Sequence, residues 1–238
     1  MKPMCAAAVL SAAVILVFCP SVQAYEEGPV ESGGTVSGKV TYGGPVPTRT
    51  ILPTKDQQVC GELREEPEVK VGPDGGVQDA IVYLVGIEQG KPWPAEDQEP
   101  VLDNKDCIFQ PHVQAVPAGS LGVHNSDPVL HNTHGFYGRR TAFNIALPNQ
   151  GQTIDVELQR SGQVRIECDA HGWMLGWVYV VDNPYYVVTG EDGTFEITDV
   201  PPGQYTLVAD QEYTGPIEVE VSVEPGGTAE VPVELEQP

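Results

Sequence analysis

The short segment from Cys168 to Met174 places three potential metal ligands within one loop. It reads Cys168-Asp-Ala-His171-Gly-Trp-Met174, so a thiolate, an imidazole and a thioether lie a few residues apart. Sulfur ligands favour copper, whereas a structural zinc site usually has more than one cysteine. Two imidazoles, one thiolate and a weak thioether make up a type 1 copper set. The segment therefore predicts three of the four ligands of one copper ion.

The second imidazole must come from another part of the chain, and His131 is the best candidate. It ends the loop Asn125-Ser-Asp-Pro-Val-Leu-His131, which follows an expected strand and can reach across to Cys168. His134 lies three residues further on and remains an alternative, either in place of His131 or Met174 or as an additional ligand.

Short strands must hold these loops. Gly and Pro number 26 and 22, aromatic residues make up only 7%, and no long helical period follows the first 24 residues. Closely spaced strands separated by turn residues predict an all-β sandwich or barrel. Side chains alternate along a strand, so Cys168 shares an apolar face with Val164 and Ile166 and points into the core. The expected strands here are 108–116, 120–125, 153–158, 163–168 and 177–181.

The N-terminus predicts export. Lys2 precedes the apolar run 6–18, and Val22-Gln-Ala24 supplies small residues for cleavage, so residues 1–24 are expected to be a signal peptide cleaved near Ala24. A lipoprotein with Cys19 at its mature end is the alternative. We expect a periplasmic or secreted protein with no transmembrane segment once the signal is removed.

The cysteine count fits an oxidising compartment. Cys60, Cys107 and Cys168 remain after the signal, and an odd number leaves one thiol unpaired or bound to something. Cys60 and Cys107 can form a disulfide, which leaves Cys168 free as a ligand. The formal net charge of −22 argues against nucleic acid as a partner.

The ligand segments resemble the plastocyanin, pseudoazurin and amicyanin group of cupredoxins. The pattern of that group is His-Asn, followed by Cys-x2-His-x2/4-Met-x-Gly-x-Val-x-Val. Here it reads His131-Asn132, followed by Cys168-x2-His171-x2-Met174-x-Gly-x-Val-x-Val. The short spacing from His171 to Met174 is most similar to amicyanin, and the resemblance covers about residues 103–181.

This resemblance implies a Greek-key β-sandwich that holds one type 1 copper through His131, Cys168, His171 and Met174. It also implies that Asn132 braces the two ligand loops and hydrogen-bonds near the sulfur. By the same resemblance, His171 is the ligand at the solvent edge, where electrons leave. Trp173 would belong to an apolar docking rim beside it.

The C-terminal part resembles a carboxypeptidase regulatory-like, transthyretin-type β-sandwich. The resemblance rests on Thr189-Gly-Glu-Asp-Gly-Thr-Phe195 and Val200-Pro-Pro-Gly-Gln-Tyr205. We expect an N-terminal β segment at 25–91, the cupredoxin domain at 92–182 and this module at 183–238. Residues 35–90 carry similar strand patterns, so a split sandwich formed by 35–90 and 185–236 is a further hypothesis. Residues 25–34 are expected to be a flexible leader, and 45–78 loops.

A one-electron carrier with an unidentified redox partner protein is the leading prediction, and no set of catalytic residues suggests an enzyme. Copper capture or delivery is the alternative, to which His112, His124 and His134 would contribute. A third interpretation is an envelope scaffold that binds a partner through its β module. His112 and His124 alternate with apolar neighbours and are expected to point outward.

Overall fold

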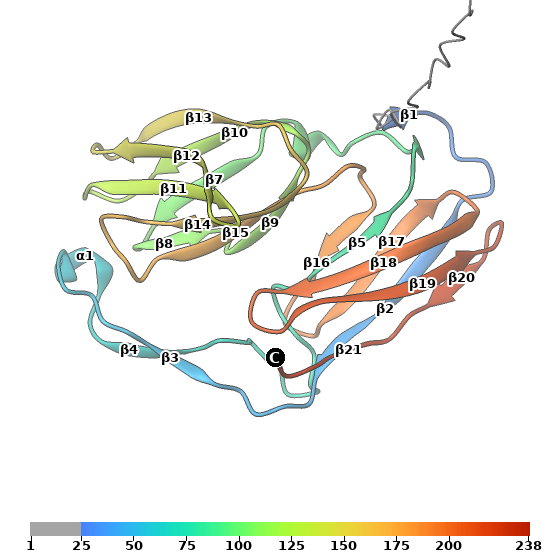
Figure 1. Cartoon of the computed structure of the whole chain (residues 1–238), viewed down its shortest axis with the longest axis horizontal. Coiled ribbons are helices and arrows are strands. Elements are labelled where there is room, and N and C mark those ends of the chain that lie inside the picture. Colours follow the sequence, from blue (N-terminus) through green and yellow to red (C-terminus); the bar gives the residue numbers. More distant parts are fainter. Residues whose placement is uncertain (1–24) are drawn as a thin grey trace, which may run out of the picture.

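The computed structural model describes residues 25–238, so the predicted signal peptide and the cysteine at position 19 lie outside the described residues. Two β-sandwiches lie side by side, and the chain passes from one to the other and back (Figure 1). The predicted all-β fold class is confirmed. Within residues 25–238, the helices are too short and too polar to cross a membrane.

Strands between residues 101 and 180 form the first sandwich, in two facing sheets. One sheet contains β7 (Val101–Lys105), β8 (Ile108–Gln110), β10 (Gly119–Asn125) and β13 (Gln152–Leu158). The other contains β9 (Val113–Val116), β11 (His131–Tyr137), β12 (Arg140–Leu147), β14 (Gly162–Glu167) and β15 (Leu175–Val180). Their orders are β13-β10-β7-β8 and β12-β11-β14-β15-β9. β7 runs parallel to β10 and β9 parallel to β15, and the other neighbours are antiparallel.

Alternating apolar side chains build the core between these sheets. Leu121 and Val123 of β10 and Val164 and Ile166 of β14 are fully buried in one cluster. Each such side chain stabilises the fold by about 1.5–3 kcal/mol relative to an exposed position. Cys168 and Met174 belong to the same cluster, so the packing of the core also fixes the candidate ligands.

The chain on both sides of the first sandwich combines into the second one. The strands are β2 (Gly34–Tyr42), β5 (Ile81–Val85), β16 (Tyr186–Val188), β17 (Thr194–Val200), β18 (Gly203–Gln211), β19 (Gly215–Val223), β20 (Thr228–Glu230) and β21 (Val233–Leu235). Their sheets have the orders β16-β5-β18-β19 and β17-β2-β20, with β21 also paired to β2. β5 therefore pairs with two strands of the C-terminal segment, the arrangement that a split sandwich requires.

A buried cluster and polar contacts join the two sandwiches. Ile81 of β5 and Tyr179 of β15 belong to one apolar cluster. The Tyr179 hydroxyl donates a hydrogen bond to Asp210 Oδ2 at 3.0 Å. His112 Nε2 lies 2.7 Å from Glu212 Oε1. His112 thus points out of the first core, but the second sandwich covers it.

The region from 45 to 78, expected to consist of loops, contains a hairpin arm that reaches from the second sandwich to the first (Figure 1). Its strands are β3 (Thr48–Ile51) and β4 (Arg64–Pro67). Residues 52–63 between them, the cap segment, include the short helix α1 (Gln57–Cys60). A disulfide joins Cys60 to Cys107 in the turn between β7 and β8. The strands of this hairpin contain Pro and charged residues and lack apolar alternation, so the sequence pattern predicts loops here instead of strands.

Two other expectations are wrong. Residues 25–34 are not a free leader, because β1 (Glu26–Glu27) pairs with β6 (Gln89–Gly90) and the Tyr25 hydroxyl donates to the Lys91 carbonyl. The stretch 108–116 is not one strand but β8 and β9, which belong to different sheets. Pro111, between them, has no amide hydrogen for a strand ladder. A short 3₁₀ helix, η1 (Ala95–Gln98), precedes β7.

Candidate metal centre

The candidate ligands gather at one end of the first sandwich. His131 is the first residue of β11, and Cys168 directly follows β14. His171 and Met174 lie in the loop that leads to β15, where the Met174 amide donates to the His171 carbonyl at 2.9 Å. β11 and β14 are hydrogen-bonded neighbours, so the sheet itself brings the two ligand segments together.

Three donor atoms converge. His131 Nδ1 and His171 Nδ1 are 3.0 Å apart, and they lie 4.0 and 3.8 Å from Cys168 Sγ. With bonds of about 2.0 Å to nitrogen and about 2.3 Å to sulfur, the values for zinc, one metal ion would hold such atoms about 3 to 4 Å apart. The residues present therefore fit a metal ion of the size of copper or zinc, bound by two imidazoles and one thiolate.

The far side of each ring faces a carboxylate. His131 Nε2 lies 2.8 Å from Asp127 Oδ2, and His171 Nε2 lies 2.8 Å from Asp56 Oδ2. Because a carboxylate accepts hydrogen bonds, both rings are assigned with a hydrogen on Nε2. Their Nδ1 lone pairs then point at each other across 3.0 Å, and such an arrangement calls for a proton or a metal cation between them.

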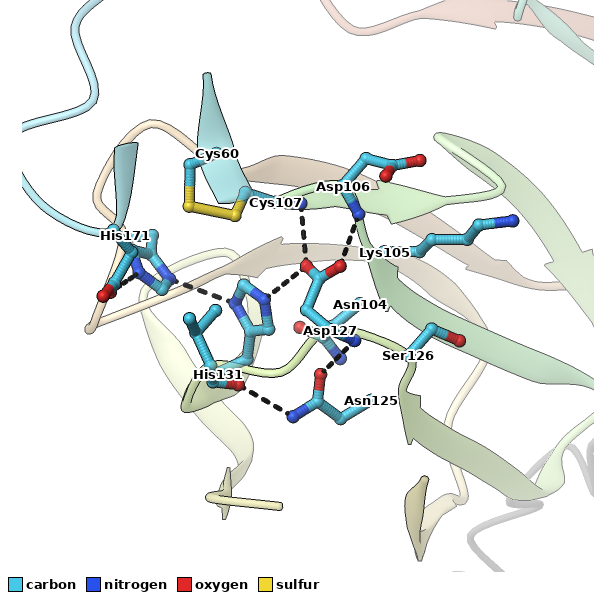
Figure 2. Close-up of polar contacts among 12 residues, drawn as sticks. Cys60, Asn104, Lys105, Asp106, Cys107, Asn125, Ser126, Asp127, His131 and His171 are labelled. Carbon is cyan, nitrogen blue, oxygen red and sulfur yellow. Dashed lines mark hydrogen bonds and ion pairs between the residues drawn. A yellow bond between two sulfur atoms is a disulfide. The ribbon is translucent and has the colours of Figure 1, made fainter. Parts of the chain in front are cut away.

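Asp127 connects the site to the disulfide turn (Figure 2). Its carboxylate accepts hydrogen bonds from the amides of Asp106 and Cys107 at 2.8 and 2.9 Å, as well as from His131. Asp106 and Cys107 have φ values of 56° and 55°, which point both amides at the same side chain. His131 is thereby held by a carboxylate that the backbone has already fixed in place.

The Cys168 sulfur is buried and surrounded by amide donors. The backbone amides of Asn132 and His171 point at Sγ from 3.4 and 3.3 Å. Burial raises the pKa of the Cys168 thiol, and these amides oppose that rise because they stabilise the thiolate. Burial also lowers the pKa of His131, with Asp127 acting in the opposite direction. Burial thus favours the uncharged form of each of these two side chains, and the polar contacts around them favour the charged form.

The Asn132 side chain joins the two ligand segments. Its Oδ1 accepts a hydrogen bond from the Asp169 amide at 3.2 Å, directly after Cys168. Its Nδ2 donates to Asn144 Oδ1 at 2.6 Å and to the Ile145 carbonyl at 2.9 Å. Asn132 therefore lies between the two segments and restrains the sulfur through its backbone amide.

The resemblance predicts that His171 is exposed to solvent, and this prediction is wrong. The His171 side chain is 0% exposed, because Asp56 and the cap segment cover its Nε2 edge. Trp173 packs beside it, with the ring centroids 4.9 Å apart. Met174 is also buried, at 2% exposure, in the core cluster that contains Cys168.

His134 does not join this site. It belongs to neither of the two clusters of potential metal ligands found in residues 25–238. Its Nδ1 contacts the Asp169 carboxylate at 3.2 Å, and its Nε2 contacts Thr141 Oγ1 at 2.9 Å. His131 and Thr133 are buried on the inner face of β11, so His134 falls on the other face by alternation. The His124 ring contacts Thr153 Oγ1 at 2.7 Å, on the adjacent strand β13.

Sequence reasoning missed two residues of the site, Asp56 and Asp127. Asp127 stands four residues before His131 in a loop already singled out, so a carboxylate near a candidate histidine ligand was a usable signal. Asp56 lies 115 residues from His171, in the cap segment of the hairpin arm. A single sequence carries no signal for that contact.

Comparison with solved structures returns copper proteins with low identity. A copper-containing nitrite reductase from Thermus scotoductus is 16% identical over 36% of this chain and 23% of its own, with a TM-score of 0.32. A purple cupredoxin from Nitrosopumilus maritimus is 22% identical over 35% of this chain and 100% of its own, with a TM-score of 0.31. Amicyanin from Paracoccus versutus is 18% identical over 42% of this chain and 97% of its own, with a TM-score of 0.32.

Searches against family models and against curated proteins return no match. The aligned part spans less than a quarter of the nitrite reductase chain. The assignment of the metal centre therefore rests on this chain's own residues.

Proposed function

We propose that the protein binds one copper ion through His131, Cys168, His171 and Met174 and passes single electrons. The observation that carries this proposal is the convergence of two Nδ1 atoms and one free thiol in a buried site. Among residues 25–238, Cys168 is the free cysteine, since the other two form a disulfide.

The donor set favours copper and electron transfer. A thiolate with two imidazoles and a weak thioether suits both oxidation states of copper, so bound copper would supply reversible one-electron exchange. The chain holds the ligands by β-strand pairing, by Asn132 and by the two carboxylates, and these contacts keep the ligands in place when the charge of the ion changes. Because four donors come from the chain itself, we propose a carrier and not an enzyme.

An aromatic side chain offers a route from this enclosed site to the surface. Trp173 packs on His171 and lines a surface hollow of about 550 Å³ together with Arg165. We propose that a redox partner protein receives or supplies electrons over Trp173, because His171 itself is covered. Nucleic acid is not a partner in this proposal, since the protein carries a formal net charge of −22.

Export is part of the same proposal. A disulfide persists in oxidising compartments, and Cys60 and Cys107 form one. We therefore propose that the protein acts in the periplasm or outside the cell.

The test is addition of Cu(II) to the purified mature protein, with the visible spectrum recorded. We expect one copper per chain, an intense thiolate-to-copper band and a reversible one-electron potential. Cys168→Ser should lose the band and keep its fold. A wild-type protein without that band would contradict the metal assignment.

Copper capture or delivery is the second candidate, and one observation favours it. The complete burial of His171 would slow the loss of a bound ion. Transfer of copper to an acceptor chelator, combined with no electron exchange with small redox reagents, would support delivery over electron transfer.

A further inference from the structure

Asp56 stands at the N-cap position of α1, where an Asp side chain ordinarily caps its own helix. It is the residue before α1, and its carbonyl accepts hydrogen bonds from the amides of Val59 and Cys60, both at 2.8 Å. An Asp at this position commonly caps the helix with its carboxylate. Here the carboxylate makes no such bond and instead contacts His171 Nε2 at 2.8 Å.

Several contacts anchor the cap segment, so that the position of Asp56 relative to His171 is fixed. The paired strands β3 and β4 hold its two ends, and the disulfide fixes Cys60 to Cys107 of the first sandwich. Within the segment, Gln57 Nε2 donates to the Pro53 carbonyl at 2.9 Å. Asp56 itself has a left-handed backbone, with φ at 52°, so the chain turns sharply where the carboxylate meets the ring.

The contact lies where a charge acts strongly on a metal. His171 is 0% exposed, and Asp127 places a second carboxylate on the opposite ligand ring at the same distance of 2.8 Å. A carboxylate on the far nitrogen of a metal-bound imidazole fixes the ring orientation and makes the ring a stronger donor. Negative charge near the metal also stabilises its more positive oxidation state. Lys55 is the residue before Asp56, and its positive charge lowers the pKa of the Cys168 thiol, the opposite of the effect that a negative charge would have.

We propose that Asp56 is a positioning residue of the metal centre, supplied by the cap segment of the β3-β4 hairpin arm. It holds His171 with Nδ1 toward the metal, and its charge favours Cu(II) over Cu(I). The inference rests on the proposed copper site. It gives the cap segment a role in the chemistry of that site, in addition to covering it.

The experiment compares Asp56→Asn and Asp56→Ala with Glu62→Gln in the full mature protein. Glu62 is an exposed carboxylate of the same cap segment, so its removal changes the net charge equally without touching His171. We expect both Asp56 variants to shift the reduction potential of the copper upward, while Glu62→Gln keeps the wild-type value.

A second measurement uses the copper-free protein. Long-range proton–nitrogen spectra should show the His171 ring with its hydrogen on Nε2 in the wild type and in Glu62→Gln. In Asp56→Ala that preference should be lost, whereas the amide spectrum of the rest of the chain should stay the same.

The outcomes separate the two proposals. A wild-type protein without a thiolate-to-copper band refutes the copper site and the inference with it. A normal band, combined with Asp56 variants whose potential and His171 tautomer match those of Glu62→Gln, overturns the inference alone.

Discussion

Removal of the Asp127 carboxylate should destabilise the copper-free protein strongly. Asp127 is 4% exposed and accepts hydrogen bonds from two backbone amides and from His131. Each buried donor left without a partner costs about 1–3 kcal/mol. Asp106 is exposed, so the buried donors are the Cys107 amide and His131 Nε2; at about 1.5 kcal/mol each, they give a loss of about 3 kcal/mol in the free energy of unfolding for Asp127→Ala.

Thermal unfolding and urea titration of copper-free protein measure this loss. For a chain of this size, about 3 kcal/mol corresponds to a decrease in Tm of roughly 6 to 12 °C. Asp155→Asn is the matched control, because Asp155 is exposed on β13 of the same sandwich. Its effect should stay within about 0.5 kcal/mol. If Asp127→Ala loses less than about 1 kcal/mol, water or a local shift satisfies the donors, and the argument that Asp127 holds the site is refuted.

Three further predictions concern the interface, the disulfide and the route to the surface. Burial raises the pKa of Asp210, so its contribution to stability is present below its unfolded pKa and lost as the pH rises through the folded one. Asp210→Asn should therefore gain stability over the wild type at pH 7 and lose that advantage toward pH 4, as followed by Tm. Replacement of Cys60 and Cys107 by Ser should lower the free energy of unfolding by about 2–4 kcal/mol and speed amide exchange in the cap segment. Trp173→Ala should keep the copper band but slow electron exchange with an external redox reagent in stopped-flow measurements.

Each of these has a result that would contradict it. A constant stability difference between Asp210→Asn and wild type across that pH range would mean that Asp210 does not titrate differently on folding. Unchanged exchange in the cap segment after loss of the disulfide would mean that β3 and β4 hold it alone. Equal electron-exchange rates with and without Trp173 would mean that electrons do not pass over Trp173.

The candidate ligands could be chosen from the sequence because their signal is local. Cys168, His171 and Met174 lie within one loop, and the apolar face of the preceding strand already directs Cys168 inward. The pairing of the Ile81 strand with the C-terminal segment could also be anticipated, because the resemblance to a transthyretin-type sandwich implies it and the C-terminal piece alone is small for a core of its own.

Strands whose inward-facing side chains are polar could not be predicted from the sequence pattern. In β11 the buried face carries His131 and Thr133, and in β7 it carries Asn104. Apolar alternation is therefore missing from strands that help to form the site. The Asp56 contact could not be predicted at all, because it depends on how the hairpin arm packs against the first sandwich.

The path of the chain between the two sandwiches bears on which insertions the second sandwich could accept. The chain leaves the second sandwich after β5 and returns as β16, and these strands are antiparallel neighbours, with Tyr186 opposite Tyr83. Exit and re-entry therefore lie about one strand spacing apart, roughly 5 Å. The first sandwich is in effect a large insertion in a hairpin connection. The second sandwich could carry a short turn or a different inserted domain at this point, without any change in its own strand order.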